Sequence, residues 1–190
     1  MAMSLPTFDK SWTLFLDRDG VINRRLPGRY VMHPDEFDYL PSSLESIIKL
    51  SKIFGRIIIV TNQKGVGKSL MSQADLDLIH EKMIADLKEK GGQVDAIYTA
   101  TAAVLTSNSM HKPNPGMGLQ AKVDFPTIDF KKSIIVGDSI SDMEFGFGLG
   151  MWTVLVEGKE EEKEAAALIE VDQRVKSLAT WMDILNNKKA

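Results

Sequence analysis

The chain has 190 residues, and its shares of hydrophobic (44%) and charged (26%) residues are those of an ordinary globular protein. This length suffices for one sizeable core, so we expect residues 1–190 to form a single domain. The net charge of −3 argues against nucleic acid and membrane surfaces as partners, and the lack of cysteine excludes disulfides and thiolate metal sites.

Apolar runs and helical patterns alternate from the start of the chain. The first predicted strand covers residues 12–16, an apolar run interrupted only by Thr13, as in strands that are buried on both faces. The first predicted helix begins at Ser42, which forms a capping-box pattern with Glu45, and it ends before Gly55. Between these two elements, residues 21–41 are too few for a folded cap domain.

The alternation continues to the end of the chain. A second helix is predicted to begin at Ser72, with Asp75 completing a capping box. We expect the acidic run 159–164 to be a solvated turn or helix start. The order of elements predicts an α/β fold, a doubly wound parallel sheet with right-handed crossovers and no cap. The later predicted strands are residues 56–60, 94–99, 133–136 and 153–156, and the later helices are residues 72–91, 115–123, 142–147 and 175–185.

Two carboxylates, Asp17 and Asp19, follow the first predicted strand. The carboxyl ends of parallel strands open onto the ligand crevice of such folds. A buried carboxylate there needs a cation or hydrogen-bond donors to offset the cost of desolvation. The pair therefore indicates a metal site that contains a nucleophile. A solvated acidic turn at the end of a strand is the alternative interpretation.

Further polar groups follow the later strands in sequence order. Thr61 ends the second predicted strand, and Lys112 lies between a loop and a helix start. Asp138 ends the fourth strand, four residues before Asp142. Each of these signals is weak alone, but together, each after its strand or loop, they form a strong pattern.

These motifs resemble the haloacid dehalogenase (HAD) superfamily of phosphatases. The similarity covers residues 12–156 and is closest to the branch that contains histidinol phosphatases and D-glycero-D-manno-heptose 1,7-bisphosphate phosphatases. Of these two groups, the heptose bisphosphate phosphatases match the sequence better, because of the GVG segment (65–67) and the PNPGM end (113–117) of the KPNPGM segment. The segments that carry the resemblance are FLDRDGVIN (15–23), TNQ (61–63), GVG (65–67), KPNPGM (112–117) and VGDS (136–139).

The resemblance implies hydrolysis through an aspartyl-phosphate, with Asp17 as the nucleophile and Asp19 as general acid and then base. Crowding beside another carboxylate is expected to raise one pKa of the pair, which suits an acid. A carboxylate that attacks a phosphate dianion needs charge neutralisation, and Mg²⁺ is the oxygen-seeking cation that provides it. We expect Asp17 and Asp138 as side-chain ligands, and the resemblance adds the backbone carbonyl of Asp19.

Two more residues complete the expected catalytic set. Thr61 can donate its hydroxyl to a phosphoryl oxygen, and Lys112 supplies a positive charge. We expect Asp142 to orient Lys112 or a water of the metal without touching substrate. The alternative is that Asp142 is an ordinary acid in the first turn of a helix.

A basic loop, residues 23–30, follows the first strand and could hold the second phosphate of a bisphosphate. The alternative is a solvated loop with unrelated charges. His111 stands where the heptose family has an arginine, and it can donate to phosphate when protonated, near or below its usual pKa of about 6.5. We interpret Gly65 and Gly67 as allowing a sharp turn of a substrate loop. The predicted substrate-binding residues are Arg25, Arg29, Asn62, Gln63, Lys64 and His111.

The clearest departure from the resembled families concerns zinc. Those families carry a Cys-x-His and a Cys-x-Cys pair that bind a structural zinc. The aligned positions here hold no credible zinc set, so we expect a zinc-free variant whose loop is held by packing. These positions are Ala100, Ala102, Asn108 and Met110.

The leading expectation is a Mg²⁺-dependent phosphatase that removes the 7-phosphate of heptose 1,7-bisphosphate. The rivals are a phosphatase for histidinol phosphate or another small phosphomonoester, and a non-catalytic phosphate-binding module. Gly67 and Lys68 resemble the end of a P-loop, but Asn62 stands where that motif needs a glycine, which argues against an ATPase. His80 lies on the apolar stripe of the second helix, where we expect a structural role.

We expect a small sugar phosphate as the partner of a monomeric enzyme. The sequence contains no basic-then-apolar leader and no apolar run long enough to cross a bilayer, so a cytoplasmic location is expected.

Overall fold

The computed structural model describes residues 6–104, 106 and 109–187. Within them, six strands form one sheet in which every neighbouring pair is parallel, in the order β3-β2-β1-β4-β5-β6. The doubly wound α/β fold expected from the sequence is therefore confirmed. The strands are β1 (Thr13–Leu16), β2 (Arg56–Asn62), β3 (Ala96–Ala100), β4 (Ser133–Gly137), β5 (Trp152–Val156) and β6 (Gln173–Val175).

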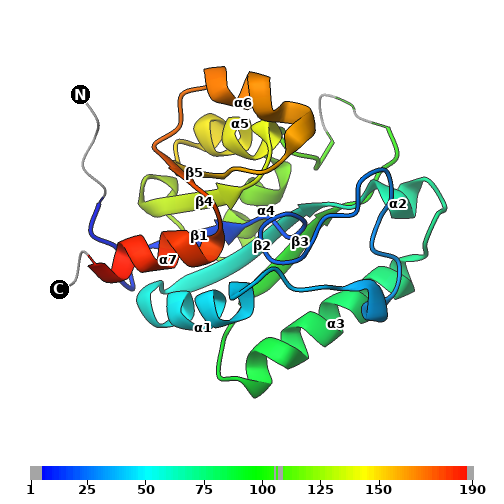
Figure 1. Cartoon of the computed structure of the whole chain (residues 1–190), viewed down its shortest axis with the longest axis horizontal. Coiled ribbons are helices and arrows are strands. Elements are labelled where there is room, and N and C mark those ends of the chain that lie inside the picture. The colour runs from blue at the N-terminus through cyan, green and yellow to red at the C-terminus, as the bar shows by residue number, and fades with distance from the viewer. Residues whose placement is uncertain (1–5, 105, 107–108, 188–190) are drawn as a thin grey trace.

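Helices cover both faces of the sheet (Figure 1). One face packs against α1 (Ser43–Ile53), α3 (Gln73–Glu89) and α7 (Leu178–Asn187), and the other against α4 (Gly116–Asp124), α5 (Ile140–Leu149) and α6 (Lys163–Leu168). In the described part of the chain, no helix has the length and apolarity needed to span a membrane. The shorter helices are η1 (Pro34–Glu36), α2 (Lys64–Gly67), η2 (Phe130–Lys132) and η3 (Glu160–Glu162).

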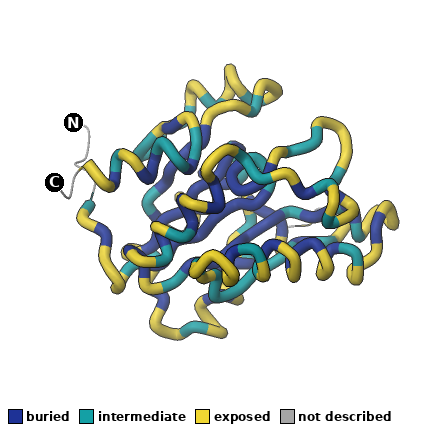
Figure 2. Tube along the Cα trace, turned by 60° about the horizontal axis from the view of Figure 1, so that its bottom comes forward, coloured by how far each residue is buried: buried dark blue, intermediate teal, exposed yellow. Residues whose placement is uncertain are grey.

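Side chains of the central strands alternate between two cores. On β1, Leu14 and Leu16 belong to the core under α1 and α7, whereas Phe15 belongs to the core under α4 and α5. Because both faces are covered, the apolar residues of these strands form continuous runs instead of occupying every second position. Figure 2 shows the result, a buried central layer with exposed turns and outer helix faces around it.

The loop between β1 and α1 leaves the carboxyl end of the sheet open. Residues 17–42 are all described, and their regular structure is limited to η1, so the absence of a cap is confirmed. The loop folds back on itself. The N–H of Arg24 donates to the carbonyl of Asp38 at 2.7 Å, and the N–H of Leu40 donates to that of Ile22 at 3.0 Å.

The start of α1 differs from the sequence prediction. Ser42 has a φ of 58° and its side chain makes no capping hydrogen bond, so the capping box predicted with Glu45 is wrong. Gly55 is also not a left-handed helix end. A Cβ atom there would overlap the carbonyl oxygen of Lys10, so this glycine is required by the close approach of two backbone segments.

Other helix signals are confirmed. The capping box of Ser72 and Asp75 opens α3, and Gly91, with a φ of 78°, follows its end. The predicted last helix begins later than expected, because Val175 ends β6 and α7 begins at Leu178. At three residues, β6 is too short to show a periodic pattern.

The acidic run is a helix start, as expected, and it also contacts the rest of the molecule. Glu160–Glu162 forms η3 and Lys163 begins α6. A carboxylate oxygen of Glu162 accepts from the N–H of Ile140 at 2.8 Å, at the start of α5.

Candidate active site

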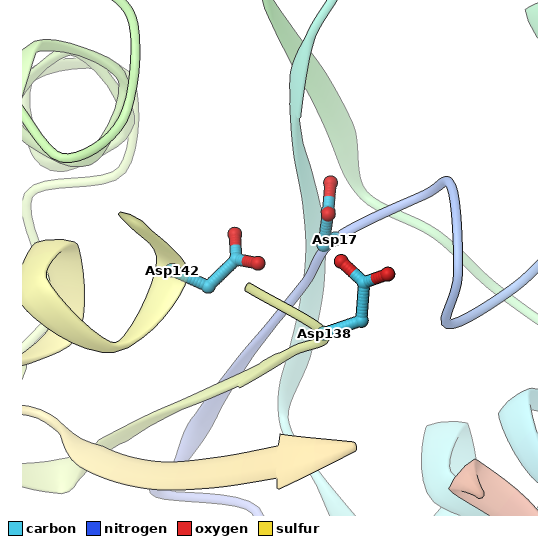
Figure 3. A group of neighbouring side chains, drawn as sticks. All are labelled: Asp17, Asp138 and Asp142. Atoms are coloured by element: carbon cyan, nitrogen blue, oxygen red, sulfur yellow. The ribbon is translucent and has the colours of Figure 1, made fainter. Parts of the chain in front are cut away.

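Three carboxylates meet at the carboxyl end of the sheet, as Figure 3 shows. Asp17 follows β1, Asp138 follows β4, and Asp142 lies in the first turn of α5. β1 and β4 are neighbours, and the strand order diverges from this pair, so their ends form the switch point at which such folds bind ligands. One oxygen from each carboxylate lies within 4.8 Å of the other two.

The negative charges of this cluster are incompletely balanced. Burial, and next the charge of Asp142, raise the pKa of Asp17 to about 7. Burial, followed by the charges of Asp17 and Asp142, raise the pKa of Asp138 to about 8. The cluster therefore resists its own full ionisation, and a bound cation would relieve this.

The ammonium of Lys112 lies inside the cluster. Its Nζ atom is 2.9 Å from Oδ1 of Asp17 and 2.6 Å from Oδ1 of Asp142, and it donates to the carbonyl of Val60 at 2.7 Å. Two ion pairs and one hydrogen bond therefore surround the ammonium. Burial opposes the charged form, but the charges of Asp142 and Asp17 outweigh it and raise the pKa of Lys112. Lys112 therefore stays charged.

Asp142 divides its two oxygens between the site and its own helix. Oδ1 faces Lys112, while Oδ2 accepts from the N–H (3.0 Å) and the hydroxyl (2.6 Å) of Ser139 in a capping box. Asp142 is thus both a neighbour of Lys112 and a first-turn acid. A Cβ atom on Gly137 would overlap the Asp142 side chain, so this approach requires glycine.

The carboxylate of Asp19 is held apart from the cluster. Arg18 donates to both of its oxygens, from Nε at 3.1 Å and from Nη2 at 3.0 Å. Asn23 and Gln63 donate to it at 2.9 and 2.7 Å. Burial alone would raise the pKa of Asp19, but Arg18 and these hydrogen bonds outweigh burial and lower it.

The expectation of a raised pKa for the acid of the pair is therefore wrong for Asp19. The raised pKa belongs to Asp17, which is buried beside Asp142. Arg18 explains the difference, because its guanidinium binds one member of the pair and contributes only its backbone N–H to the other.

The last two residues of β2 and the residue that follows it organise the site. The amide of Gln63 donates to Oγ1 of Thr61 at 2.8 Å, so the Thr61 hydroxyl keeps its own proton for another acceptor. Asn62 exchanges two hydrogen bonds with the backbone of Lys112, at 3.0 and 3.2 Å. Two residues predicted to bind substrate thus hold Asp19, Thr61 and Lys112 in place.

Two arginines of the predicted basic loop differ in their distance from the carboxylate cluster. Nη2 of Arg25 lies 3.6 Å from Oδ2 of Asp138 and 3.6 Å from Glu161. Arg29 instead pairs with Glu36 at 2.8 Å. Both arginines nevertheless line a cavity of about 440 Å³ beside Asp19, whose walls also include Leu26, Tyr30, Asn62, Gln63 and Lys68.

His111 is fully buried, and neither ring nitrogen has a hydrogen-bond partner among the described residues. Burial, and then the charge of Lys64, lower its pKa. Donation by a protonated imidazole is therefore disfavoured at neutral pH, although a neutral ring still has one N–H donor.

Gly65 and Gly67 lie in α2, so their interpretation as a sharp turn is wrong. A Cβ atom on Gly65 would lie 3.0 Å from the Tyr30 ring, and one on Gly67 would overlap the carbonyl oxygen of Thr101. Close packing against α2 is the reason for glycine at both positions.

The positions aligned with the zinc ligands lie near the end of β3. Ala100 is the last residue of β3, and Ala102 and Met110 follow in the next loop, while Asn108 lies outside the described residues. The only candidate metal cluster among the described residues is that of Asp17, Asp138 and Asp142.

Comparisons with known proteins agree on the family. A family model described as polynucleotide kinase 3 phosphatase matches residues 13–164. A D-glycero-alpha-D-manno-heptose-1,7-bisphosphate 7-phosphatase of Mycobacterium tuberculosis is 39% identical over 133 residues, which is 70% of either chain. The crystal structure of a putative HAD-like phosphatase from Mesorhizobium loti matches with a TM-score of 0.73 and 26% identity, covering 97% of this chain and 90% of that one. The chain belongs to the HAD superfamily of phosphatases.

Within the HAD superfamily, the chain is also similar to heptose bisphosphate phosphatases of Bordetella bronchiseptica, both in sequence and in structure. The D-glycero-beta-D-manno-heptose-1,7-bisphosphate 7-phosphatase of Bordetella bronchiseptica is 34% identical over 155 residues, 80% of this chain and 84% of that protein. A crystal structure of the D,D-heptose 1,7-bisphosphate phosphatase from B. bronchiseptica has a TM-score of 0.83 and 31% identity, covering 93% of this chain and 99% of that one.

The B. bronchiseptica structure is a complex with magnesium and phosphate. The carboxylate cluster of this HAD phosphatase fits such a cation. It offers only oxygen ligands, it is buried, and the raised pKa values of Asp17 and Asp138 report unneutralised negative charge.

Proposed function

We propose that this HAD phosphatase hydrolyses a phosphomonoester of a small sugar phosphate, and that D-glycero-D-manno-heptose 1,7-bisphosphate, losing its 7-phosphate, is the leading substrate. The carrying observation is the packing of three buried carboxylates around Lys112 at the switch point of the sheet. The names of the relatives support the sugar. Because those names include both the alpha and the beta anomer, both are candidates.

Asp17 is the proposed nucleophile. Its Oδ1 atom is held by the N–H of Arg18 at 2.8 Å and by Nζ of Lys112 at 2.9 Å. These two contacts fix the orientation of the carboxylate and leave its second oxygen to attack phosphorus. In-line attack would form an aspartyl-phosphate and release the sugar alcohol.

Asp17 and Asp138 are the proposed side-chain ligands of Mg²⁺, with the backbone carbonyl of Asp19. A bound cation of this kind offsets the repulsion between carboxylates and phosphate. Lys112 contributes positive charge from its place beside the carboxylates of Asp17 and Asp142 and the carbonyl of Val60. Thr61 donates its hydroxyl proton to a phosphoryl oxygen.

Asp19 is the proposed general acid and base. As an acid it needs a proton, and the four hydrogen bonds to its carboxylate oppose protonation. We infer that some of these bonds break when Asp19 turns toward the leaving oxygen. As a base toward the attacking water, the ionised carboxylate is already in the required form.

The cavity beside Asp19 is the proposed place for the sugar and its second phosphate. Arg25 and Arg29 line it and supply positive charge, and Asn62 and Gln63 form its polar floor. We propose Lys64 and His111 as further contacts to the substrate. Tyr30 and Leu26 offer apolar surface to the carbon skeleton of the sugar.

We also propose that residues 1–190 act as one domain and as a cytoplasmic monomer. Sedimentation velocity at micromolar concentration would test the monomer directly. A species of twice the mass of 21.1 kDa would contradict it.

Phosphate release with Mg²⁺ tests the function. The substrates are both anomers of heptose 1,7-bisphosphate, histidinol phosphate, other sugar phosphates and a 3′-phosphorylated oligonucleotide, with Asp17→Asn as the control. A preference for one heptose anomer is the expected result. Low activity spread over many phosphomonoesters would contradict the proposed heptose substrate but would still support the proposed phosphatase mechanism. If no phosphate release depends on Asp17, the non-catalytic phosphate-binding module is favoured instead.

A further inference from the structure

His80 is a buried titratable side chain that the proposed reaction does not use. It lies on α3, is 8% exposed, and its Nε2 atom is 3.0 Å from Nη1 of Arg18. A guanidinium has donors and no acceptors, so Arg18 donates and Nε2 accepts. The imidazole is therefore neutral, with its proton on Nδ1. In agreement, burial and then the charge of Arg18 lower the pKa of His80 to about 4.

Arg18 fills the space between His80 and the active site. Its side chain has 1% exposed surface, and its guanidinium carbon lies 5.9 Å from the centre of the Phe37 ring. Nε and Nη2 donate to the two oxygens of Asp19, while Nη1 donates to His80. The planar guanidinium is therefore held at two edges at once.

The packing of α3 fixes His80 in turn. Leu76, Ile79 and Met83 lie on the same stretch of α3, and none of them has exposed surface. Their contacts with the sheet set the rotation of the helix and hence the position of the imidazole. The acceptor for Arg18 is thus placed by the core and not by a mobile loop.

We propose that His80 is a positioning residue which, through Arg18, sets the orientation of the Asp19 carboxylate. The inference rests on the proposed function, in which Asp19 transfers protons. With Nη1 anchored on α3, the other edge of the guanidinium presents parallel donors to both oxygens of Asp19. Without that acceptor, a buried N–H of Arg18 has no partner, which favours rotation of the guanidinium and of the carboxylate bound to it.

Two substitutions separate the hydrogen bond from the packing of the ring. His80→Leu removes the acceptor, and His80→Gln replaces it with an amide oxygen on a side chain of similar reach. His33→Leu, at an exposed imidazole, is the control for loss of a histidine elsewhere. Each variant is assayed with Mg²⁺ on the sugar phosphate and on 4-nitrophenyl phosphate, whose leaving group needs little protonation.

We expect His80→Leu to lower kcat on the sugar phosphate by about 10- to 100-fold, as for a misplaced catalytic group, with little change in KM. The loss on 4-nitrophenyl phosphate should be several-fold smaller, and His80→Gln should recover most of the activity. Equal losses on both substrates, or equal losses in the Leu and Gln variants, would overturn the positioning role.

A second readout does not depend on turnover. In protein labelled with ¹⁵N-arginine, the Nε–H signal of Arg18 is identified by its absence in Arg18→Lys, and its exchange with solvent is measured. We expect exchange at least about 10-fold faster in His80→Leu, and near the unsubstituted rate in His80→Gln, because the anchored guanidinium is buried. Unchanged exchange in His80→Leu would refute the inference. An inactive unsubstituted protein would refute the proposed function, and the exchange rates would then decide the role of His80 alone.

Discussion

The Nζ atom of Lys112 lies 2.6 Å from Oδ1 of Asp142, a side chain with no exposed surface. Two buried charges at this distance depend on each other, because removing either one leaves the other in a medium that solvates it poorly. Asp17 shares the same ammonium at 2.9 Å, so one positive charge supports two negative ones.

Lys112→Met should therefore destabilise the protein by about 3–5 kcal/mol, the cost of leaving buried charge without its partner. Adding Asp142→Asn should return part of this stability. Urea unfolding of the two single variants and the double variant forms the thermodynamic cycle that measures the coupling. Strictly additive losses would show that the pair at 2.6 Å contributes no coupling energy.

Asp17→Asn should lower turnover by at least about 10³-fold, because an amide cannot attack phosphorus and the remaining groups of such a site act as a unit. Stability should not fall at pH 8, since the change removes one negative charge from a crowded cluster. Phosphate release and urea unfolding check the two effects. Asp183→Asn, at an exposed position on α7, is the matched control and should change neither.

Stability should fall as pH rises when divalent cations are removed. In the folded state the pKa of Asp17 is raised to about 7 and that of Asp138 to about 8, both from an ordinary value of 3.8. The folded protein then binds more protons than the unfolded chain between about pH 4 and pH 8. Their contribution to stability is complete below pH 4 and is lost as pH rises through the folded values.

Mg²⁺ should reverse this loss at pH 8, because it binds the ionised carboxylates of the folded state only. Thermal unfolding with EDTA or with Mg²⁺, from pH 5 to pH 8, measures both slopes. Asp138→Asn should flatten the slope without metal and abolish most of the stabilisation by Mg²⁺. Equal stabilisation by Mg²⁺ in that variant would place the cation elsewhere.

Gly20→Ala should weaken Mg²⁺ binding. Gly20 has a φ of 91°, and a Cβ atom there would overlap Oδ2 of Asp138. Gly28→Ala is the matched control, since Gly28 also has a positive φ (74°) but a Cβ atom there would meet nothing within 4 Å. Both variants should lose about 1 kcal/mol from backbone strain. Titration calorimetry should show weaker Mg²⁺ binding for Gly20→Ala alone, and equal affinities would contradict this role of Gly20.

Much of the site could be predicted from the sequence because most of its residues lie at or directly after the carboxyl ends of strands. Asp17, Thr61 and Asp138 each come directly after an apolar run, and parallel strands bring their carboxyl ends to one edge. The order of these motifs also identified Lys112, which lies on a loop.

The arrangement of side chains around Asp19 could not be predicted in the same way. The contact of Arg18 with His80 joins residues 62 positions apart and depends on how α3 packs on the sheet. Sequence periodicity placed His80 on an apolar stripe but did not identify its partner. One signal was present, because alternation along an extended segment places Arg18 on the same face as Leu16, and residues of α3 pack in the core on that face.

Other errors came from backbone geometry. Ser42 and Glu45 match a capping box in sequence, but the left-handed conformation of Ser42 prevents the capping bond. Glycine is required at positions 55, 65 and 67 by close contacts with distant segments. From the local sequence alone, the same glycines are interpreted as a helix end and a sharp turn.

The pairing of β1 with β4 has a consequence for how the protein is made. Leu16 stands beside Val136, so more than half of the chain must be synthesised and closed into a loop before Asp17 meets Asp138. A nascent chain can pair β1 with β2, and β2 with β3, well before that, as domains fold from the N-terminus during synthesis. Closing the loop to β4 carries the entropy cost of a long-range contact. The first half of the molecule would therefore already hold its nucleophile while the second proposed metal ligand is still missing, so the cation could bind only after β4 has joined the sheet.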